Sequence, residues 1–254
     1  MEIHFLGTGS AYPGAKRDNT SLCLTGVSSQ ILIDVSGNPC LKLKQINIDL
    51  GNLDAVILTH FHIDHIYGLP SLLWGMWLEN RKKPLTIYCD YRNETKLNHW
   101  LDTMEADQWA IKFPIIIKTF NGNIKENLFT KGDFKISCFP ALHSVPTIGL
   151  EFMYHNKRII YSGDSEINSH IQAYSHIDIL IHEATFARKN VPNHASLRQI
   201  TDFYDLDTIK NVYLVHLSDN EPYEEELNRL GMRHKIKIAE DMEHISVKNN
   251  ILQG

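Results

Sequence analysis

The sequence predicts a layered α/β protein in which helices cover mixed β-sheets. In the first part of the chain, short apolar runs alternate with turn-rich segments, as in a strand meander. In the later part, apolar runs alternate with helical segments. The 254 residues are 43% hydrophobic and 22% charged, which is ordinary for a globular protein and excludes disorder, collagen and coiled coil as the main state.

Each element is justified by its local pattern. Strands are expected where a short apolar run lies between turn residues, namely at 3–6, 21–24, 30–34, 54–59, 85–89, 113–120, 134–139, 148–154, 158–163, 177–182, 211–216, 235–239 and 245–248. Helices are expected at 39–46, 68–80, 166–174, 196–204 and 222–230. No Pro-, Gly- or Ser-rich linker divides the chain, so residues 1–254 are expected to form one domain.

Cysteine and charge content indicate the compartment. The four cysteines form no CxxC pair, which argues against a zinc ribbon or a disulfide scaffold and favours a reducing compartment. The formal net charge is −5, unlike that of a protein coated in positive charge for nucleic acid. The N-terminus lacks the pattern of a signal peptide, and no window approaches the roughly 18 apolar residues of a membrane span. A cytoplasmic protein with no membrane partner is expected.

Histidine is abundant, with 14 residues, and it is the commonest metal ligand and acid or base near neutral pH. Four potential metal ligands stand within six positions at the end of an apolar run: His60, His62, Asp64 and His65. Irregular backbone there lets alternate side chains converge. His60 and His62 could then share one ion, while Asp64 and His65 turn toward a second. Imidazole and carboxylate suit Zn²⁺, Mn²⁺ or Fe²⁺.

Three later apolar runs also end in polar residues: His143, Asp164 and His216. A site with two ions about 3.5–4 Å apart needs ligands from separate strands, with a carboxylate bridging the pair. Asp164 is the natural bridge. We therefore expect two divalent metal ions, with Zn²⁺ the first choice and Mn²⁺ the alternative.

The motif HFHIDH at 60–65, followed by His143, Asp164 and His216, resembles the metallo-β-lactamase superfamily. The resemblance extends from FLGTGSAYP near the start to AEDMEHISV near the end. It implies a four-layer αββα sandwich with the metals at one edge of the two sheets. It further implies that His60, His62 and His143 bind the first ion, that Asp64, His65 and His216 bind the second, and that Asp164 binds both.

Two later segments are similar to ribonuclease Z: HEATF at 182–186 and NHASL at 193–197. By this resemblance Glu183 orients His194, and His194 protonates the leaving oxygen or stabilises the developing charge. A hydroxide shared by the ions would attack phosphorus, but an alkoxide leaving group still needs a proton. The hypothesis is a dinuclear metal-dependent phosphodiesterase with His194, Glu183 and Asp64 as catalytic residues. His182 is expected to be buried support.

One departure from ribonuclease Z bears on the substrate. Bacterial ribonuclease Z usually carries a long arm between the third histidine motif and the bridging Asp, and grips tRNA with it. Here the path from 143 to 164 has room for two strands and a turn. The bare hairpin is similar to the smaller cyclic phosphodiesterase of the bacterial phosphonate pathway, although the cysteine-rich metal site of that relative has no counterpart in the N-terminal turn segment. RNA and a small cyclic phosphate both remain candidate substrates, and the family implies a possible homodimer.

An acyl hydrolase and a binding module without turnover are the two alternatives to the phosphodiesterase. The same metals could hydrolyse a thioester, lactone or lactam, but that chemistry gives no evident need for Glu183 and His194. A metal-stabilised binding module without turnover is the non-enzymatic alternative. The complete ligand set argues against it, because a decayed relative should lose ligands first.

The remaining features are interpreted as structural. The short basic clusters Arg81–Lys83, Arg233–Lys235 and Lys42/Lys44 are expected to be solvated surface. Trp74, Met76 and Trp77 are expected to pack in the core. Ser144 and Ser218 follow proposed ligands and could hydrogen-bond a phosphate. The histidines expected to be bystanders are His4, His99, His155, His170, His176, His234 and His244.

Overall fold

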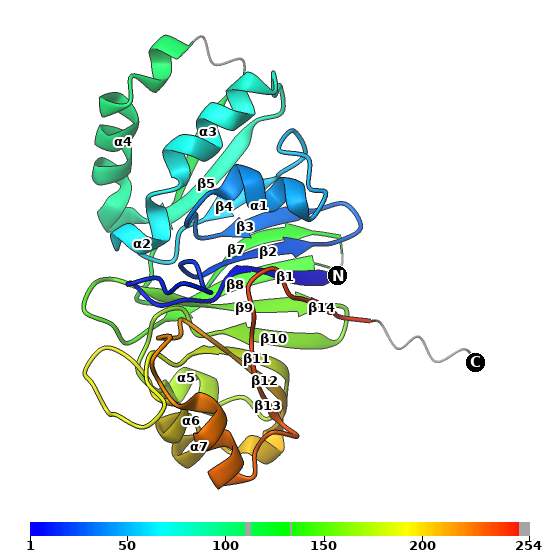
Figure 1. Cartoon of the computed structure of the whole chain (residues 1–254). Coiled ribbons are helices and arrows are strands. Elements are labelled where there is room, and N and C mark those ends of the chain that lie inside the picture. Colours follow the sequence, from blue (N-terminus) through cyan, green and yellow to red (C-terminus); the bar gives the residue numbers. More distant parts are fainter. Residues whose placement is uncertain (110–112, 133, 249–254) are drawn as a thin grey trace.

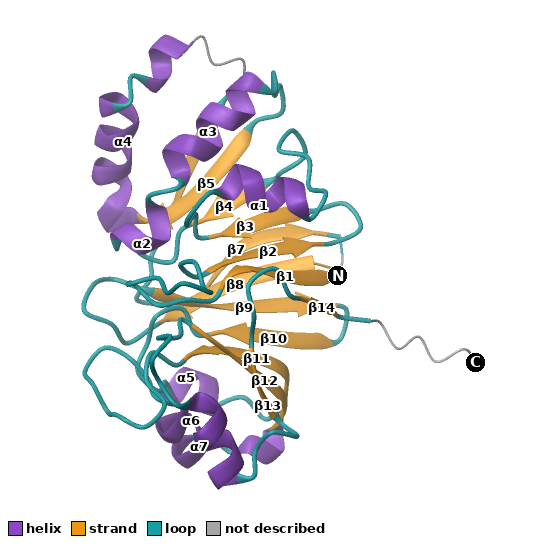
Figure 2. Ribbon diagram, viewed as in Figure 1, coloured by secondary structure: helices purple, strands orange, loops and turns teal. Residues whose placement is uncertain are grey.

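The computed structural model describes residues 1–109, 113–132 and 134–248, whose strands form two seven-stranded sheets (Figure 2). The first sheet has the order β14 (His244–Ser246), β1 (Glu2–Gly7), β2 (Ser21–Thr25), β3 (Gln30–Ile33), β4 (Ala55–Ile57), β5 (Leu85–Asp90) and β6 (Ile115–Phe120). The second has the order β13 (Ile236–Ile238), β12 (Ile209–Val215), β11 (Ile177–Glu183), β10 (Lys157–Tyr161), β9 (Ile148–Tyr154), β8 (Phe134–Pro140) and β7 (Glu126–Lys131).

Both sheets are mixed. In the first, β14, β1, β2 and β3 pair antiparallel, and β3 to β6 pair parallel. In the second, β7 to β10 pair antiparallel, and β10 to β13 pair parallel. Each sheet therefore combines a meander with a parallel part, as the early and late sequence patterns predicted.

The helices form the two outer layers. They are α1 (Pro39–Gln45), α2 (Ile63–Ile66), α3 (Leu69–Leu78), α4 (Glu94–Thr103), α5 (Ser169–Gln172), α6 (Leu197–Phe203) and α7 (Tyr223–Leu230), with short 3₁₀ turns at Tyr91–Asn93, Ala106–Trp109 and Leu206–Thr208. Figure 1 shows α1, α3 and α4 on one side of the paired sheets and α5, α6 and α7 on the other. The expected four-layer αββα sandwich is confirmed. Within the described residues, no helix has the length and apolar character needed to cross a membrane.

The alternation of side chains along the strands builds the layers. In β2, Leu22 and Leu24 pack between the two sheets, whereas Cys23 joins the core beneath the first helical layer. A third core lies under α5, α6 and α7 and includes Ile160 and Leu180. A strand that is buried on both faces reads as a continuous apolar run, which explains why these strands were easy to predict.

Several predicted elements differ in extent. The helix predicted over 166–174 is only Ser169–Gln172, because Asn168 caps it and the preceding residues hydrogen-bond to neighbouring loops. The strand predicted from 113 begins at Ile115, after a proline that lacks a backbone N–H. The structure also contains α2, α4 and β7, which were not predicted. Residues 60–65 were expected to be irregular, yet Ile63–Ile66 form α2; α4 buries Leu97 alone, and β7 buries no residue fully.

The parallel strands position the polar loops. The residues that follow the C-terminal ends of β4, β10, β11 and β12 gather at one edge of the sandwich, together with the loop after β8. Figure 1 shows this edge on the left, with α2 and the loop after β11. The chain therefore concentrates its chemistry at the ends of strands from both sheets.

Candidate metal centre

Three imidazoles converge at the predicted first metal position. His60 follows β4, His62 precedes α2, and His143 lies in the loop after β8. Nδ1 of His62 lies 3.1 Å from Nε2 of His60 and 3.0 Å from Nε2 of His143. Ligands held tetrahedrally at about 2.0–2.1 Å from zinc lie about 3.3 Å apart, so the spacing suits a single ion.

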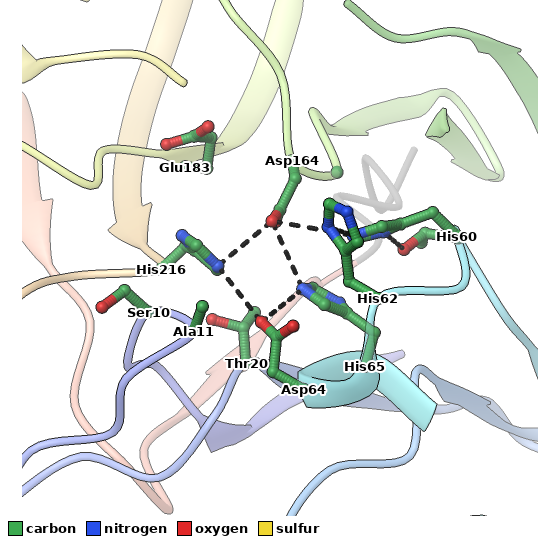
Figure 3. Close-up of polar contacts among 12 residues, drawn as sticks. Ser10, Ala11, Thr20, His60, His62, Asp64, His65, Asp164, Glu183 and His216 are labelled. Atoms are coloured by element: carbon green, nitrogen blue, oxygen red, sulfur yellow. Dashed lines mark hydrogen bonds and ion pairs between the residues drawn. The ribbon is translucent and has the colours of Figure 1, made fainter. Parts of the chain in front are cut away.

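The second cluster contains two carboxylates and two imidazoles, all of them buried (Figure 3). Oδ2 of Asp164 lies 3.1 Å from Nε2 of His216 and 3.4 Å from Nε2 of His65. Oδ2 of Asp64 lies 3.2 Å from Nε2 of His65 and 3.6 Å from Nε2 of His216. These atoms surround a second point at which a cation could bind.

Asp164 lies between the two clusters. Its Oδ2 is 3.8 Å from Nε2 of His60, in addition to its contacts with the second cluster (Figure 3). All seven residues predicted as ligands therefore come together in space. Their assignment as metal ligands remains a prediction.

Unpartnered atoms test whether a metal fits. Nε2 of His65, Nε2 of His216 and Oδ1 of Asp164 are buried and make no hydrogen bond within the described part of the chain. Buried polar atoms are normally satisfied, and imidazole nitrogen with carboxylate oxygen is a donor set suited to Zn²⁺ or Mn²⁺. The residues present fit divalent metal, because an ion would satisfy all three atoms.

The electrostatics of the cluster favour a cation. Burial lowers the pKa of His60 well below its usual value, so its imidazole is neutral and keeps a lone pair for a ligand bond. Burial would raise the pKa of Asp64, but the nearby imidazoles of His216 and His65 outweigh it and lower that pKa. Although burial works against the charged form, the charges of His216 and His65 lower the pKa of Asp164 as well. The two carboxylates are therefore ionised and attract positive charge.

A threonine and a carboxylate orient two of the imidazoles. Asp34 accepts a hydrogen bond from Nδ1 of His65 at 2.7 Å, and it accepts two more from the backbone N–H and the hydroxyl of Thr59, each at 2.8 Å. The Thr59 hydroxyl has donated its proton to Asp34, so it can only accept from Nδ1 of His60, 3.1 Å away. Both imidazoles thus keep Nε2 free to face the cluster.

The same arrangement recurs on the other side of the centre. The Thr185 hydroxyl lies 3.0 Å from Oε2 of Glu183 and 2.9 Å from Nδ1 of His216. Since it donates to the carboxylate, it accepts from His216, whose Nε2 is left to face Asp164. Nδ1 of His143 donates to the backbone carbonyl of Asn193 at 2.7 Å. Each of these imidazoles therefore has one nitrogen held and the other directed inward.

His194 stands beside the cluster and is held by Glu183. Its Nδ1 lies 2.9 Å from Oε1 of Glu183, which is fully buried, while the His194 side chain is 24% exposed. The His194 ring stacks on His216 at 5.4 Å between centroids and contacts His143 edge-on at 5.0 Å. Although burial lowers the pKa of His194, the hydrogen bond to Glu183 outweighs it and raises that pKa. The imidazole is both near the candidate ligands and open to solvent.

The structure places the other residues named from the sequence. His182 is fully buried and bonded to the backbone carbonyl of Glu183 and the hydroxyl of Tyr204, as expected for a supporting residue. Ser144 lies beside the centre, and Ser218 lies 3.4 Å from Ser10 between their hydroxyl oxygens.

In two of the three basic clusters one residue is buried instead of solvated, while Lys82, Lys83 and Lys44 are exposed as expected. The guanidinium of Arg81 is buried and donates to the carbonyls of Leu50, Leu53, Lys83 and Pro84. Lys42 is buried beside Asp18, with 2.8 Å between the charged atoms. Met76 is in the core as predicted, whereas Trp74 is 42% exposed and contacts Trp77 at a tilt and Trp109 edge-on.

Sequence reasoning missed the residues that orient the ligands: Asp34, Thr59, Thr185 and the carbonyl of Asn193. Asp34 ends the run QILID, and a carboxylate directly after an apolar strand is the same signal that singled out Asp164. The two threonines carry no such signal, because a lone hydroxyl next to a ligand is common. Each also contacts a residue distant in sequence, Asp34 for Thr59 and His216 for Thr185, and only the fold brings these together.

Comparison with known proteins defines the class. The short form of human tRNase Z has the same fold, with a TM-score of 0.79 and 24% identity over 98% of this chain and 100% of that chain. A diphosphatase from the PhnP family superposes with a TM-score of 0.76 and 19% identity, covering 97% of this chain and 98% of that one. Among curated proteins, ribonuclease Z of Pyrococcus horikoshii is 24% identical over 98% of this chain and 96% of its own length. The chain is a metallo-β-lactamase-fold protein of the ribonuclease Z-like branch, as its motifs predicted.

A narrower assignment comes from the family comparison. Residues 1–239 match the family described as anti-Pycsar protein Apyc1, and the chain belongs to that family. The sequence motifs did not predict this family. Ribonuclease Z of Methanococcus maripaludis is 29% identical over 152 residues, which is 60% of this chain and 48% of that relative. The matched region thus spans about half the length of that relative.

Proposed function

We propose that this protein is a dinuclear metal-dependent phosphodiesterase whose catalytic domain comprises residues 1–254. The observation that carries the proposal is the meeting of two ligand clusters at Asp164, with a carboxylate-held imidazole directly beside them. In this proposal His60, His62 and His143 hold the first ion, Asp64, His65 and His216 hold the second, and Asp164 bridges them. Zn²⁺ is the expected metal, and Mn²⁺ is the alternative.

Each residue has a role in this chemistry. When bound, the two ions supply a nucleophilic hydroxide and neutralise the charge on the phosphoryl oxygens. His194 donates a proton from Nε2 to the leaving oxygen, because Glu183 holds its Nδ1 and this hydrogen bond, which outweighs burial, raises the pKa of the imidazole. Asp64 completes the second ion site, and its loss should remove that ion and the activity.

The hairpin between the third histidine and the bridging Asp favours a small substrate. Residues 144–163 are all described, and they form a short loop, β9, a turn at His155–Asn156 and β10. This hairpin has no protruding arm, the part with which bacterial ribonuclease Z is expected to grip tRNA. Within the phosphodiesterase proposal, a small phosphodiester such as a cyclic phosphate is therefore preferred over precursor tRNA.

Substrate competition tests this preference. Purified protein loaded with Zn²⁺ or Mn²⁺ should cleave a small cyclic phosphate faster than a 3′-extended tRNA precursor. Faster cleavage of the precursor would overturn the preference while leaving the phosphodiesterase proposal intact.

A variant tests the metal assignment. Asp64→Ala should stay folded, lose one of two bound ions and lose most of its hydrolysis of bis(p-nitrophenyl) phosphate. Asp102→Ala is a matched control, since this exposed carboxylate on α4 lies outside the cluster. If Asp64→Ala hydrolyses the ester as fast as the parent, the site assignment is wrong.

The acyl-hydrolase alternative has its own test. A thioester and a lactam assayed beside the phosphodiester should be poor substrates, because carboxyl-derivative hydrolysis has no evident use for His194 and Glu183. A preference for either acyl substrate would reject the phosphodiesterase. Absence of bound metal after purification without chelator would instead support a binding module.

The proposal includes the expected location and assembly. Cys23, Cys40, Cys89 and Cys138 are all free thiols, which supports a reducing compartment such as the cytoplasm. A homodimer is proposed on the family resemblance, and light scattering would test it.

A further inference from the structure

A hollow of about 250 Å³ lies at the end of the sandwich opposite the candidate metal centre. It is lined by residues near the starts of β10, β11 and β12 and by the segment around β14. Asp178 lies near the start of β11, and Glu183, which holds His194, ends the same strand, so about 17 Å of strand separates the two regions. Figure 1 shows β14 and the N-terminus on this side of the molecule, on the right. No role described above uses this hollow.

The floor of the hollow is apolar and consists of Ile179, Tyr213, Ile245 and Val247. Three of these side chains belong to the core between the two sheets, and Ile245 packs against that core. Ile179 is 7% exposed, and Tyr213 and Val247 are each 6% exposed, so the floor is held in place by the core. A ligand that covered this floor would remove further apolar surface from water, which is favourable.

The rim of the hollow is basic. Lys157, Lys210 and Lys248 line it, and Asp178 is the one carboxylate among the lining residues. Asp178 already accepts hydrogen bonds from Nζ of Lys157 and from the backbone N–H of Arg158, each at 3.0 Å. Lys210 and Lys248 are exposed and make no ion pair with the described residues. The hollow therefore carries positive charge, although the chain as a whole has a net charge of −5.

A further cation lies close to the floor. Nζ of Lys237 lies 5.3 Å from the centre of the Tyr213 ring and 3.3 Å from the Tyr213 hydroxyl. This ammonium group adds to the positive field without entering the hollow. The charge of the rim is thus supported from the neighbouring strand β13.

We propose that this hollow binds a compact organic anion. The apolar body of the ligand packs on Tyr213 and Ile245, and its acidic group, such as a carboxylate, lies beside Lys210 and Lys248. A neutral apolar molecule would leave both ammonium groups without a partner, and an inorganic anion would leave the floor uncovered. The volume lies below the usual range for drug-sized ligands, so the ligand is small. This site is independent of the metal centre and of the proposed hydrolysis.

Titration of ¹⁵N-labelled protein with naphthalene-2-sulfonate tests the site, with backbone amide chemical shifts as the readout. Saturable shifts are expected at Ile179, Tyr213 and Ile245. 2-Naphthol has the same rings without the charge and should bind about tenfold more weakly, because it makes neither ion pair. Inorganic sulfate has the charge without the rings and should cause no saturable shift at these amides.

Variants test the rim and the floor separately. Lys210→Ala and Lys248→Ala should each raise the Kd for the sulfonate about twofold to fivefold, which is the loss of one exposed ion pair. Lys210→Arg keeps the charge and should keep the affinity. Ile245→Ser should weaken binding of the sulfonate and of 2-naphthol alike. Lys96→Ala removes an exposed ammonium group on α4 and is the matched control, with no expected change.

Three results would overturn the proposal. The first is the absence of saturable shifts at the floor amides, including the case in which the sulfonate shifts only residues near the metal centre. The second is equal affinity for the sulfonate and 2-naphthol, which would show an apolar surface without selection for charge. The third is an unchanged Kd in both lysine-to-alanine variants. Because the assay measures binding and not hydrolysis, none of these results bears on the phosphodiesterase proposal.

Discussion

The proposed role of His194 predicts a dependence on the leaving group. A departing alkoxide is a strong base and needs a proton, whereas p-nitrophenolate leaves as a stable anion. Replacing His194 by Ala should therefore slow cleavage of a cyclic phosphate, whose leaving group is an alkoxide, and affect bis(p-nitrophenyl) phosphate little.

The magnitude follows from the geometry of the pair. With Nδ1 at 2.9 Å from the fully buried Glu183, the imidazole has one orientation and a raised pKa, as a general acid requires. General acid catalysis contributes about 10²- to 10⁴-fold. At 1.36 kcal/mol for each factor of ten, His194→Ala should cost about 3–5 kcal/mol of transition-state stabilisation for the alkoxide. The p-nitrophenyl ester should lose less than about tenfold.

The assay compares kcat/KM for the two substrates in parent and variant, with bound metal measured in each. Glu183→Gln should show the same selectivity in weaker form, and His170→Ala, which alters an exposed histidine, is the control. Equal losses on both substrates with normal metal content would refute the general-acid role. Equal losses with reduced metal content would show that His194 contributes to metal binding instead.

Three further predictions concern the supporting residues. Thr185→Val removes the acceptor for Nδ1 of His216 and should weaken binding of one ion about 10- to 100-fold, whereas Thr185→Ser should keep the affinity of the parent. Competition with a chelator measures this affinity. Equal affinity in both variants would contradict the role of the hydroxyl in orienting His216. Arg81→Met leaves buried carbonyls without donors and should lower the free energy of unfolding by at least about 2 kcal/mol in urea titrations. An unchanged urea midpoint would argue against a stabilising role for Arg81. Hydrogen bonds from Arg229 and Arg188 outweigh burial and lower the pKa of Glu226 from 4.5 to about 2, so its contribution to stability is present above pH 4.5 and lost toward pH 2. In metal-free protein, Glu226→Gln should lower Tm at neutral pH, with a difference that closes across this range; a constant difference would contradict the ionic role.

The fold and the candidate ligands were largely predictable because their signals are local. Buried strands read as continuous apolar runs, and the spacing of His60, His62, Asp64 and His65 is itself a metal motif. By contrast, α4 went unnoticed because it buries Leu97 alone, and nothing in its polar sequence demands a helix. Local pattern predicts an element only where burial imposes a period.

Arg81 shows that a local pattern can also predict the wrong environment for a residue. In a run of basic residues its charge favours solvated surface, yet the structure buries it among backbone carbonyls. Whether an arginine is solvated depends on which carbonyls lie near it, and these belong to segments up to 31 residues away.

The sequence by itself determined the class of chemistry, because imidazoles and carboxylates that follow apolar strands retain their ligand character wherever the strands lie. Only the tertiary structure decided how those ligands are oriented: Asp34 holds His65 across 31 positions, and the Thr185 hydroxyl holds His216 across another 31. A hydrogen bond depends on distance and direction in space, and these are set by the pairing of strands and the packing of the two sheets.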